Sequence, residues 1–430
     1  MRRRLLDIRL LPATHFPKPV SAAAATRLTP AHIRLVTLLA LLMFISYVDR
    51  GSLAIAAPLI KDELHLSSTR LGFLLSAFFW SFTPSLFLAG WLTGRFGPRL
   101  VLTVGVALWS TGMLSTGFAA GLSSLFACRL LLGVGESAAY PCLSTLFATE
   151  LSVAQRGRAN GVTYFGQVLG PAAGTWIGGM VAATWGWRPM FIVFGALSLL
   201  WIVPWRQTEL SATHAAAPVA AKAPIPMRRL LRERALWGTT LGLFCANFAL
   251  YFLTSWLPIY LVKMRGLSMR EMAQTGGAIF VVLAISGLAT GWLFDRMLRA
   301  GANRTMLSKT FLATGYVGSS ACIVGIALAP AVWAIPLLYL NEVFHGVFGP
   351  IVLLMSQTIA GPRAISRWMG LQLMAGSVAG VVAPVVTGIV IDMTGNFSAA
   401  FGVDAVFLLL GALVWTFVVR DAEPLQWESV

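Results

Sequence analysis

Charged residues are scarce in this chain of 430 residues: Asp, Glu, Lys and Arg together make up 11%, whereas hydrophobic residues make up 57%. A soluble domain of this size cannot keep so much apolar surface away from water. The composition therefore excludes an ordinary soluble protein and predicts a chain embedded in lipid.

Cysteine is also scarce, and all four cysteines lie inside apolar runs, at Cys128, Cys142, Cys245 and Cys322. This placement argues against a disulfide framework or a Cys/His metal cluster, so we expect packing residues there. The sequence also lacks a P-loop, a nucleophile elbow and a recognisable Ser/His/Asp set. We therefore expect no enzyme activity, no cofactor or metal, and no ATP-driven step.

Apolar stretches long enough to cross a bilayer occur twelve times. They run near 33–60, 70–93, 100–120, 122–147, 159–183 and 189–205, and again near 236–262, 271–294, 306–329, 332–359, 367–391 and 397–419. They predict six-helix bundles at 33–205 and 236–419, a cytoplasmic linker at 206–235, and cytoplasmic tails at 1–32 and 420–430. The first tail lacks the unbroken apolar core of a cleaved signal peptide.

Acidic residues number 16 against 32 Lys and Arg, which gives a net charge of +16. When both termini are assigned to the cytoplasm, 24 of the 32 basic residues fall on cytoplasmic segments, in agreement with the positive-inside rule. The basic charge therefore reflects topology and contact with lipid headgroups. No aromatic or recognition motif accompanies it, so we expect no nucleic-acid partner.

An internal repeat divides the chain into two similar parts. GWLTGR at 90–95 recurs as GWLFDR at 291–296, each at the cytoplasmic end of the second predicted helix of its half. Three glycines of the fifth predicted helix recur with the same spacing on the eleventh. Two halves related in this way predict a substrate site at their interface, near the bilayer midplane.

Several separated motifs resemble the major facilitator superfamily and, within it, the anion:cation symporter family: YVDRGSLAIAAPLI at 47–60, SAFFWSF at 76–82, GWLTGRFGPR at 90–99, RLLLGVGESAAYP at 129–141, RGRANG at 156–161 and NFALYFLTSWLPIYL at 247–261. The resemblance implies an all-α membrane protein with twelve transmembrane helices in two pseudo-symmetric six-helix bundles. It also implies a monomer in the bacterial inner membrane that imports sugar acids or other carboxylates with protons.

In the first half, four charged residues lie in the middle of predicted spans, where each costs about 2.5 to 3.5 kcal/mol on insertion scales. Arg50 is predicted to bind the substrate carboxylate, because a guanidinium can hold both oxygens. Asp49 and Glu136 are predicted to exchange the coupling protons, because burial disfavours a charged carboxyl group. Arg129, seven residues before Glu136, is predicted to favour its ionised form. The alternative is a set of buried ion pairs that lock helices together.

Further substrate contacts are predicted at polar side chains around this cluster, with hydrogen bonding between helices as the alternative: Tyr47, Gln167, Asn247, Tyr251 and Thr254. Phe82 and Ser377 are predicted to contact substrate too, although sugar-acid members of the family typically carry a tyrosine at the first position and an asparagine at the second. Leu373 departs from the family pattern in the same way. These departures predict a substrate with fewer hydroxyl groups than a hexonate.

Glu342 and His345 lie one turn apart on the tenth predicted helix. They predict a second protonation site, because histidine titrates in the physiological range, or else a polar pair that packs. The loop motifs predict residues that control gating, Arg95, Asp295 and Arg296. The resemblance implies that this loop links helix ends through a charge network in the outward-open state. Gly94 replaces the acidic residue that usually precedes the first of these arginines.

These observations predict import of a small organic anion, driven by the proton gradient, by alternating access. Sodium in place of protons is left open, as is the identity of the carboxylate. The alternatives are efflux or exchange of organic anions or drugs by the same fold, and a membrane sensor that binds an anion without transporting it.

Overall fold

The computed structural model describes residues 28–208, 210, 225–419 and 422–427, and the elements assigned there are all helices. The first half of the chain forms α2 (Pro30–Glu63), α3 (Ser68–Phe96), α4 (Pro98–Thr116), α5 (Leu122–Glu136), α6 (Ala139–Glu150), α7 (Val153–Trp185), α8 (Trp187–Leu200) and α9 (Ile202–Arg206). The second half forms α10 (Met227–Leu230), α11 (Arg234–Ile259), α12 (Met269–Arg299), α13 (Arg304–Leu328), α14 (Ala334–Ser377), α15 (Ala379–Thr394) and α16 (Phe397–Leu413). The prediction of an all-helical protein is confirmed.

Eleven helices of the described chain are long and apolar enough to cross a membrane. The backbone of Gly361 leaves helical geometry at φ 65°, a conformation that glycine adopts readily. Two of the spans, Ala331–Gly361 and Arg363–Thr394, therefore meet inside α14. Helix α7 has 33 residues but is not among the eleven, because glycines and polar side chains lower its hydropathy. The one predicted span without a counterpart among the eleven, 159–183, lies on this helix.

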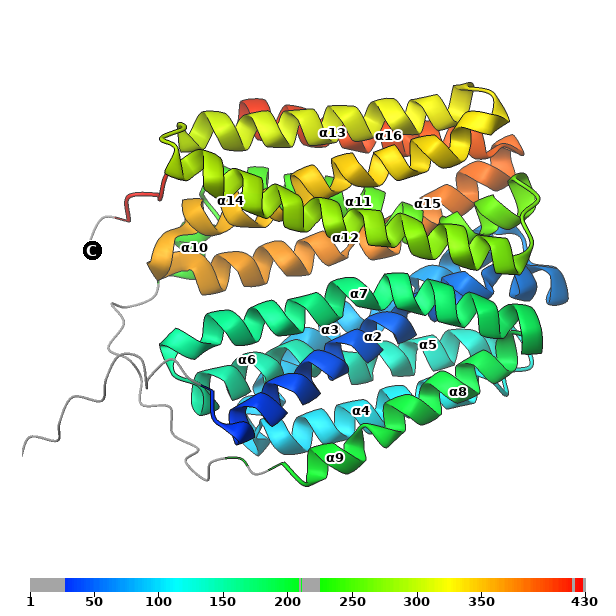
Figure 1. Cartoon of the computed structure of the whole chain (residues 1–430), viewed down its shortest axis with the longest axis horizontal. Helices are drawn as coiled ribbons and strands as arrows, with labels where there is room; N and C mark the ends of the chain where they lie inside the picture. The colour runs from blue at the N-terminus through cyan, green and yellow to red at the C-terminus, as the bar shows by residue number, and fades with distance from the viewer. Residues whose placement is uncertain (1–27, 209, 211–224, 420–421, 428–430) are drawn as a thin grey trace, which may run out of the picture.

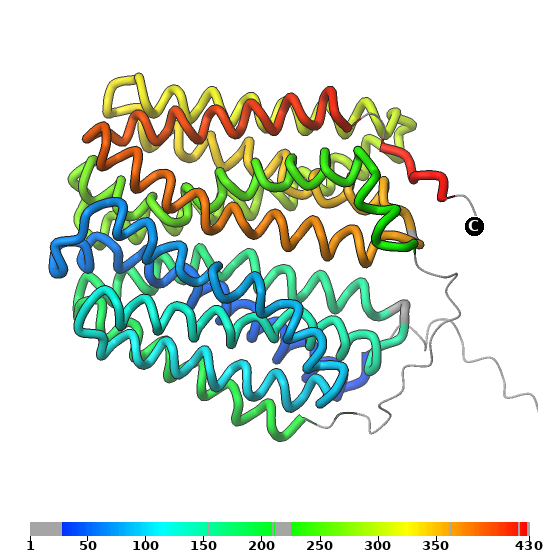
Figure 2. The backbone as a smooth tube through the Cα atoms, turned by 180° about the vertical axis from the view of Figure 1, so that it is seen from behind, coloured from blue at the N-terminus to red at the C-terminus, as the bar shows by residue number. Residues whose placement is uncertain are grey.

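The helices lie side by side in two groups. Helices α2 to α9 occupy the lower half of Figure 1 and α10 to α16 the upper half, and Figure 2 shows the same division from behind. Within the first group α7 packs along α2, and within the second α13 packs along α14 and α16. Contacts between the groups pair α2 with α11, α3 with α15, and α7 with α12. The interface between the two halves is thus built from a few long helices.

Small residues permit the closest of these approaches. Gly170 on α7 faces Phe44 and Tyr47 on α2, and a Cβ atom built on it would lie 2.6 Å from the Cβ of Tyr47. Gly277 on α12 faces Trp176 on α7 across the interface between the halves. These contacts agree with the use of small residues between membrane helices.

The two halves are tied together at one end of the helices. The carboxylate of Asp392, on α15, accepts hydrogen bonds from the backbone N–H groups of Ser68 (2.9 Å) and Thr69 (2.7 Å), at the start of α3. The side chain of Lys263 forms an ion pair with Asp62 at the end of α2. These contacts close this end of the interface.

The opposite end of the helices holds the first residues of α2 and the last described residues of the chain (Figure 1). The predicted tail at 1–32 lies mostly outside the described residues. Parts of the predicted linker at 206–235 and tail at 420–430 also lie outside them. The division into tails, linker and bundles stays a prediction.

Candidate functional site

A cavity of about 150 Å³ lies between the two halves. Its walls come from α2, α3, α5 and α7 on one side and from α11 and α12 on the other. Four of the predicted substrate-contacting residues line it, namely Tyr47, Arg50, Tyr251 and Thr254, together with Arg129. Most of the remaining lining residues are apolar, so the polar groups are few and set the orientation of a ligand.

Arg50 is engaged by a single oxygen of Glu136. Its Nη2 and Nε donate to Oε2 of Glu136 at 2.9 and 3.3 Å, and the hydroxyl of Ser46 donates to the same oxygen at 2.9 Å. Glu136 is fully buried, whereas the side chain of Arg50 is 15% exposed. The other carboxylate oxygen, Oε1, is buried without a hydrogen-bond partner. The ion pair therefore has one member, Arg50, at the cavity wall and the other, Glu136, outside the cavity lining.

Aromatic rings surround the guanidinium of Arg50. The ring centroids of Tyr47, Phe78 and Phe82 lie 4.7, 4.7 and 4.8 Å from its central carbon. Phe82 is buried and stacks on Phe78 at 4.9 Å. Cation–π contacts of this kind hold a guanidinium in one orientation. Phe82, predicted to contact substrate, thus lies against Arg50 and outside the cavity lining.

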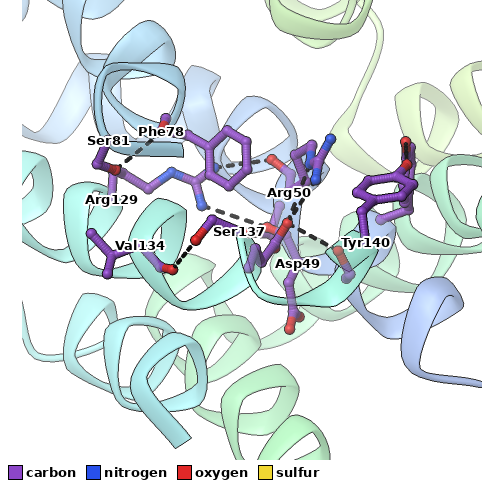
Figure 3. A network of polar contacts seen from close by, with 12 residues as sticks. Asp49, Arg50, Phe78, Ser81, Arg129, Val134, Ser137 and Tyr140 are labelled. Atoms are coloured by element: carbon purple, nitrogen blue, oxygen red, sulfur yellow. Dashed lines mark hydrogen bonds and ion pairs between the residues drawn. The ribbon is translucent and has the colours of Figure 1, made fainter. Parts of the chain in front are cut away.

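Arg129 contacts backbone rather than carboxylates. Its Nη2 donates to the carbonyl of Arg50 at 3.1 Å and its Nη1 to the carbonyl of Asp49 at 3.5 Å. Helix α5 therefore positions α2 where the two central charged residues lie (Figure 3). The predicted influence of Arg129 on Glu136 stays a prediction.

Asp49 lies behind the cavity. The hydroxyl of Ser198 on α8 donates to its Oδ2 at 2.5 Å, while Oδ1 is buried without a partner. The side chain is 1% exposed and does not line the cavity. Asp49 and Glu136 are thus both buried acids of the first half, held by different helices.

The other predicted substrate contacts differ in their surroundings. Tyr47 shares a hydrogen bond of 2.8 Å with Tyr140, and the ring of Tyr251 packs against Phe79 at 4.5 Å. The hydroxyl of Thr254 donates to the carbonyl of Leu250 in its own helix at 2.8 Å. All three residues, Tyr47, Tyr251 and Thr254, belong to the cavity wall.

Three further predicted contacts lie outside the cavity lining. Asn247 donates to the carbonyl of Gly376 at 3.0 Å, which joins α11 to α14. Ser377 donates to the carbonyl of Leu373 at 2.8 Å within α14. Gln167 is half-buried on α7. Asn247 thus bonds between helices, the alternative stated for it, whereas Ser377 bonds within its own helix.

Glu342 and His345 also lie away from the cavity. His345 is buried and its ring stacks on Phe348 at 4.7 Å. Glu342 is fully buried and accepts a hydrogen bond from the side chain of Asn341 at 2.9 Å. A buried acid that the sequence reasoning missed, Asp404 on α16, lies near enough to Glu342 for their charges to interact. The signal that found Asp49, a charge inside an apolar run, applies equally to Asp404.

The predicted gating residues are exposed and lie at the ends of α3 and α12. Arg95 lies 6.0 Å from the ring centroid of Trp91, and Arg296 lies 5.3 Å from that of Trp292. Among the described residues, no ion pair includes Asp295 or either arginine. The charge network that the resemblance implies is therefore not formed in this conformation.

Comparison with known proteins gives relatives over most of the chain. A probable sulfoacetate transporter from Cupriavidus necator is 32% identical, over 88% of this chain and 91% of that protein. A hexuronate transporter from Bacillus subtilis is 30% identical, over 89% of this chain and 92% of that protein. The predicted similarity to organic-anion transporters is confirmed.

The fold is also similar to a solved structure. A bacterial homologue of the human lysosomal transporter Spinster, in an inward-facing and occupied conformation, superposes with a TM-score of 0.79 at 18% identity, over 92% of this chain and 98% of that one. The sequence profile of the Major Facilitator Superfamily matches residues 39–366. The helical fold, the cavity between two halves and these matches together show that the chain belongs to the Major Facilitator Superfamily, a family of membrane transporters and not of enzymes.

Proposed function

We propose that this protein imports a small organic anion together with protons. The observation that carries the proposal is the ion pair between Arg50 and Glu136, with its basic member at the wall of a cavity between two halves. An anion that enters the cavity finds one guanidinium there, and a guanidinium binds carboxylates and related oxyanions in a bidentate manner. The relatives named for sulfoacetate and hexuronate transport support an anionic substrate.

Competition for Arg50 couples the anion to the proton. Both contacts of Arg50 go to one oxygen of Glu136, so an incoming anion competes with Glu136 for the same donors. If Arg50 leaves, Glu136 is a buried charge without a cation, which costs several kcal/mol. Binding a proton removes that charge. Protonation of Glu136 and binding of the anion to Arg50 therefore favour each other, and we assign Asp49 the role of a second acid in this exchange.

The cavity also bears on the class of substrate. It encloses about 150 Å³, and aromatic and aliphatic side chains form most of its wall. Polyhydroxylated sugar acids need many hydrogen-bond partners, because an unpaired buried hydroxyl costs free energy. We therefore propose a short organic anion with few hydroxyl groups.

Alternating access supplies the transport step. We propose twelve spans in two six-helix bundles, with α7 as the twelfth span, in a monomer of the bacterial inner membrane. Both termini lie in the cytoplasm, as the distribution of basic residues indicates. In this orientation the contacts Asp392 to Ser68 and Lys263 to Asp62 close the outer end. Arg95, Asp295 and Arg296 at the inner end are free to form their network when the outer end opens.

Uptake by purified protein in liposomes tests the proposal. Sulfoacetate, a hexuronate, short aliphatic carboxylates and aromatic carboxylates are offered under an imposed pH gradient and, separately, a sodium gradient. We expect accumulation of a short anion when the lumen is alkaline, and none with sodium alone. Accumulation with sodium alone, movement of organic cations in place of anions, or binding without flux would contradict the proposal and favour, in turn, sodium symport, drug efflux or a sensor.

A further inference from the structure

The second half contains a buried acidic pair that the anion site does not use. Glu342 on α14 and Asp404 on α16 are 0% and 1% exposed. Each has one oxygen, Oε2 of Glu342 and Oδ1 of Asp404, that is buried and has no hydrogen-bond partner. Neither residue lines the cavity beside Arg50. The charge of Asp404 acts on Glu342, and the adjacent Ser319 and Ser320 of α13 bond beside the two acids, so both acids lie in one region of the second half.

Polar contacts place this pair where three helices meet. Asn341 donates to Oε1 of Glu342 at 2.9 Å and accepts from the hydroxyl of Ser319, on α13, at 2.6 Å. The hydroxyl of Ser320 donates to the carbonyl of Ala405, next to Asp404, at 3.1 Å. Helix α13 thus packs against both α14 and α16 and bonds beside each of the two acids.

Among the described residues, neither Glu342 nor Asp404 forms an ion pair with a cation. The ion pairs there are Arg50 with Glu136, Arg188 with Glu63, and Lys263 with Asp62. Lys309 on α13 donates to the carbonyl of Thr416 instead. The other titratable side chains along the neighbouring helices, away from their ends, are Tyr316 and Cys322 on α13, Cys245 and Tyr251 on α11, and Tyr339, His345, Arg363 and Arg367 on α14. The two arginines of α14 donate to the carbonyls of Trp427 and Ile225 instead of to an acid. The titratable side chains of α12 and α15 lie near the ends of those two helices.

A pair of ionised carboxylates is unfavourable in these surroundings. Each buried charge without a partner costs several kcal/mol, and like charges at close range add to the cost. One proton taken from solution neutralises one carboxylate and supplies an O–H donor. The remaining carboxylate then no longer faces a like charge, and no other bond changes.

We propose that Glu342 and Asp404 form a second proton-binding site, in the half of the protein that does not hold the ion pair of Arg50 with Glu136. The two carboxyl groups hold at least one proton between them at neutral pH. The site pairs Glu342 with an acid of another helix, and His345 is not its partner.

Infrared spectroscopy of the purified full-length protein tests this inference without substrate. The C=O absorption of protonated carboxyl groups is recorded at neutral pH in H₂O and D₂O for wild type, for the double variant Glu342→Gln/Asp404→Asn, and for Glu233→Gln as control. Glu233 is a partly exposed acid at the start of α11. We expect the double variant to lose the absorption of at least one protonated carboxyl group and the control to lose none.

Thermal unfolding as a function of pH gives a second readout. The folded protein keeps a proton that the unfolded chain releases once the pH exceeds the ordinary carboxyl range. Raising the pH therefore destabilises the wild type. The double variant should show a smaller loss of stability between about pH 5 and about pH 9, a range above the pKa of about 4 that carboxyl groups have in an unfolded chain.

Either of two results would overturn the inference. An infrared absorption that is the same in wild type and double variant shows that both carboxyl groups are ionised. An absorption that appears only after sodium is withdrawn shows that the site holds sodium. Neither result depends on uptake of an anion, so failure of this inference is distinguishable from failure of the proposed import.

Discussion

Arg50 donates to Glu136 from two nitrogens, Nη2 at 2.9 Å and Nε at 3.3 Å, and both bonds end on the same carboxylate oxygen. The second oxygen of Glu136 has no partner. The guanidinium of Arg50 is therefore bound by one carboxylate oxygen of Glu136. A substrate oxyanion that offers two oxygens can replace Glu136 as its partner.

Arg50→Ala should abolish anion binding, because it removes the charged group at the cavity wall. Arg50→Lys keeps the charge but loses the planar fork, so we expect binding weakened by about tenfold or more. Isothermal calorimetry with the transported anion measures both. Arg304→Ala, at the exposed start of α13, is the matched control. If Arg50→Ala bound the anion with wild-type affinity, Arg50 would not be part of the anion-binding site.

Glu136→Gln should uncouple transport from the proton gradient. The amide mimics the protonated acid and cannot release a proton, so Arg50 stays available to the anion. We expect exchange of labelled for unlabelled substrate across the liposome membrane to continue, while accumulation driven by a pH gradient is lost. Accumulation equal to that of wild type would show that the coupling proton binds elsewhere.

Phe82→Tyr should widen the range of substrates. Phe82 lies against the guanidinium of Arg50 and stacks on Phe78, so a hydroxyl added to its ring adds a polar group beside the anion site. One hydrogen bond contributes about 1 kcal/mol, which corresponds to about fivefold in affinity. Competition of a hexuronate against the native anion measures the change. A hexuronate affinity that does not rise would place the ring edge out of reach of the substrate.

Asp392→Asn should open the outer end more often. The substitution removes the charge that accepts from two backbone N–H groups at the start of α3, and such contacts contribute about 1 kcal/mol or more. Labelling of a Thr254→Cys variant by an impermeant thiol reagent, added outside, measures access to the cavity. We expect the Thr254→Cys/Asp392→Asn double variant to be labelled several-fold faster than the Thr254→Cys single variant.

The control for this experiment is Glu63→Gln. Glu63 pairs with Arg188 at 2.7 Å, and both residues belong to the first half, so the contact does not join the two halves. Equal labelling rates in Asp392→Asn and Glu63→Gln would contradict a gating role for Asp392.

The sequence by itself determined which segments are helices and which charges are buried. Apolar runs of about twenty residues satisfy their backbone groups internally and lie in lipid, so the spans were readable without any tertiary contact. A charge inside such a run must face protein or water. That rule identifies Asp49, Arg50, Arg129 and Glu136, and it applies equally to Asp404.

Only the tertiary structure decided which of these groups meet. Arg129 lies seven residues before Glu136 on one helix, yet it bonds to backbone carbonyls of α2. Glu342 accepts from Asn341 while His345, one turn away, stacks on Phe348. The reason is physical: the rotation and depth of each packed helix set the partners of its side chains. Those quantities depend on contacts between segments far apart in the chain, such as Gly170 against Tyr47, and local spacing does not contain them.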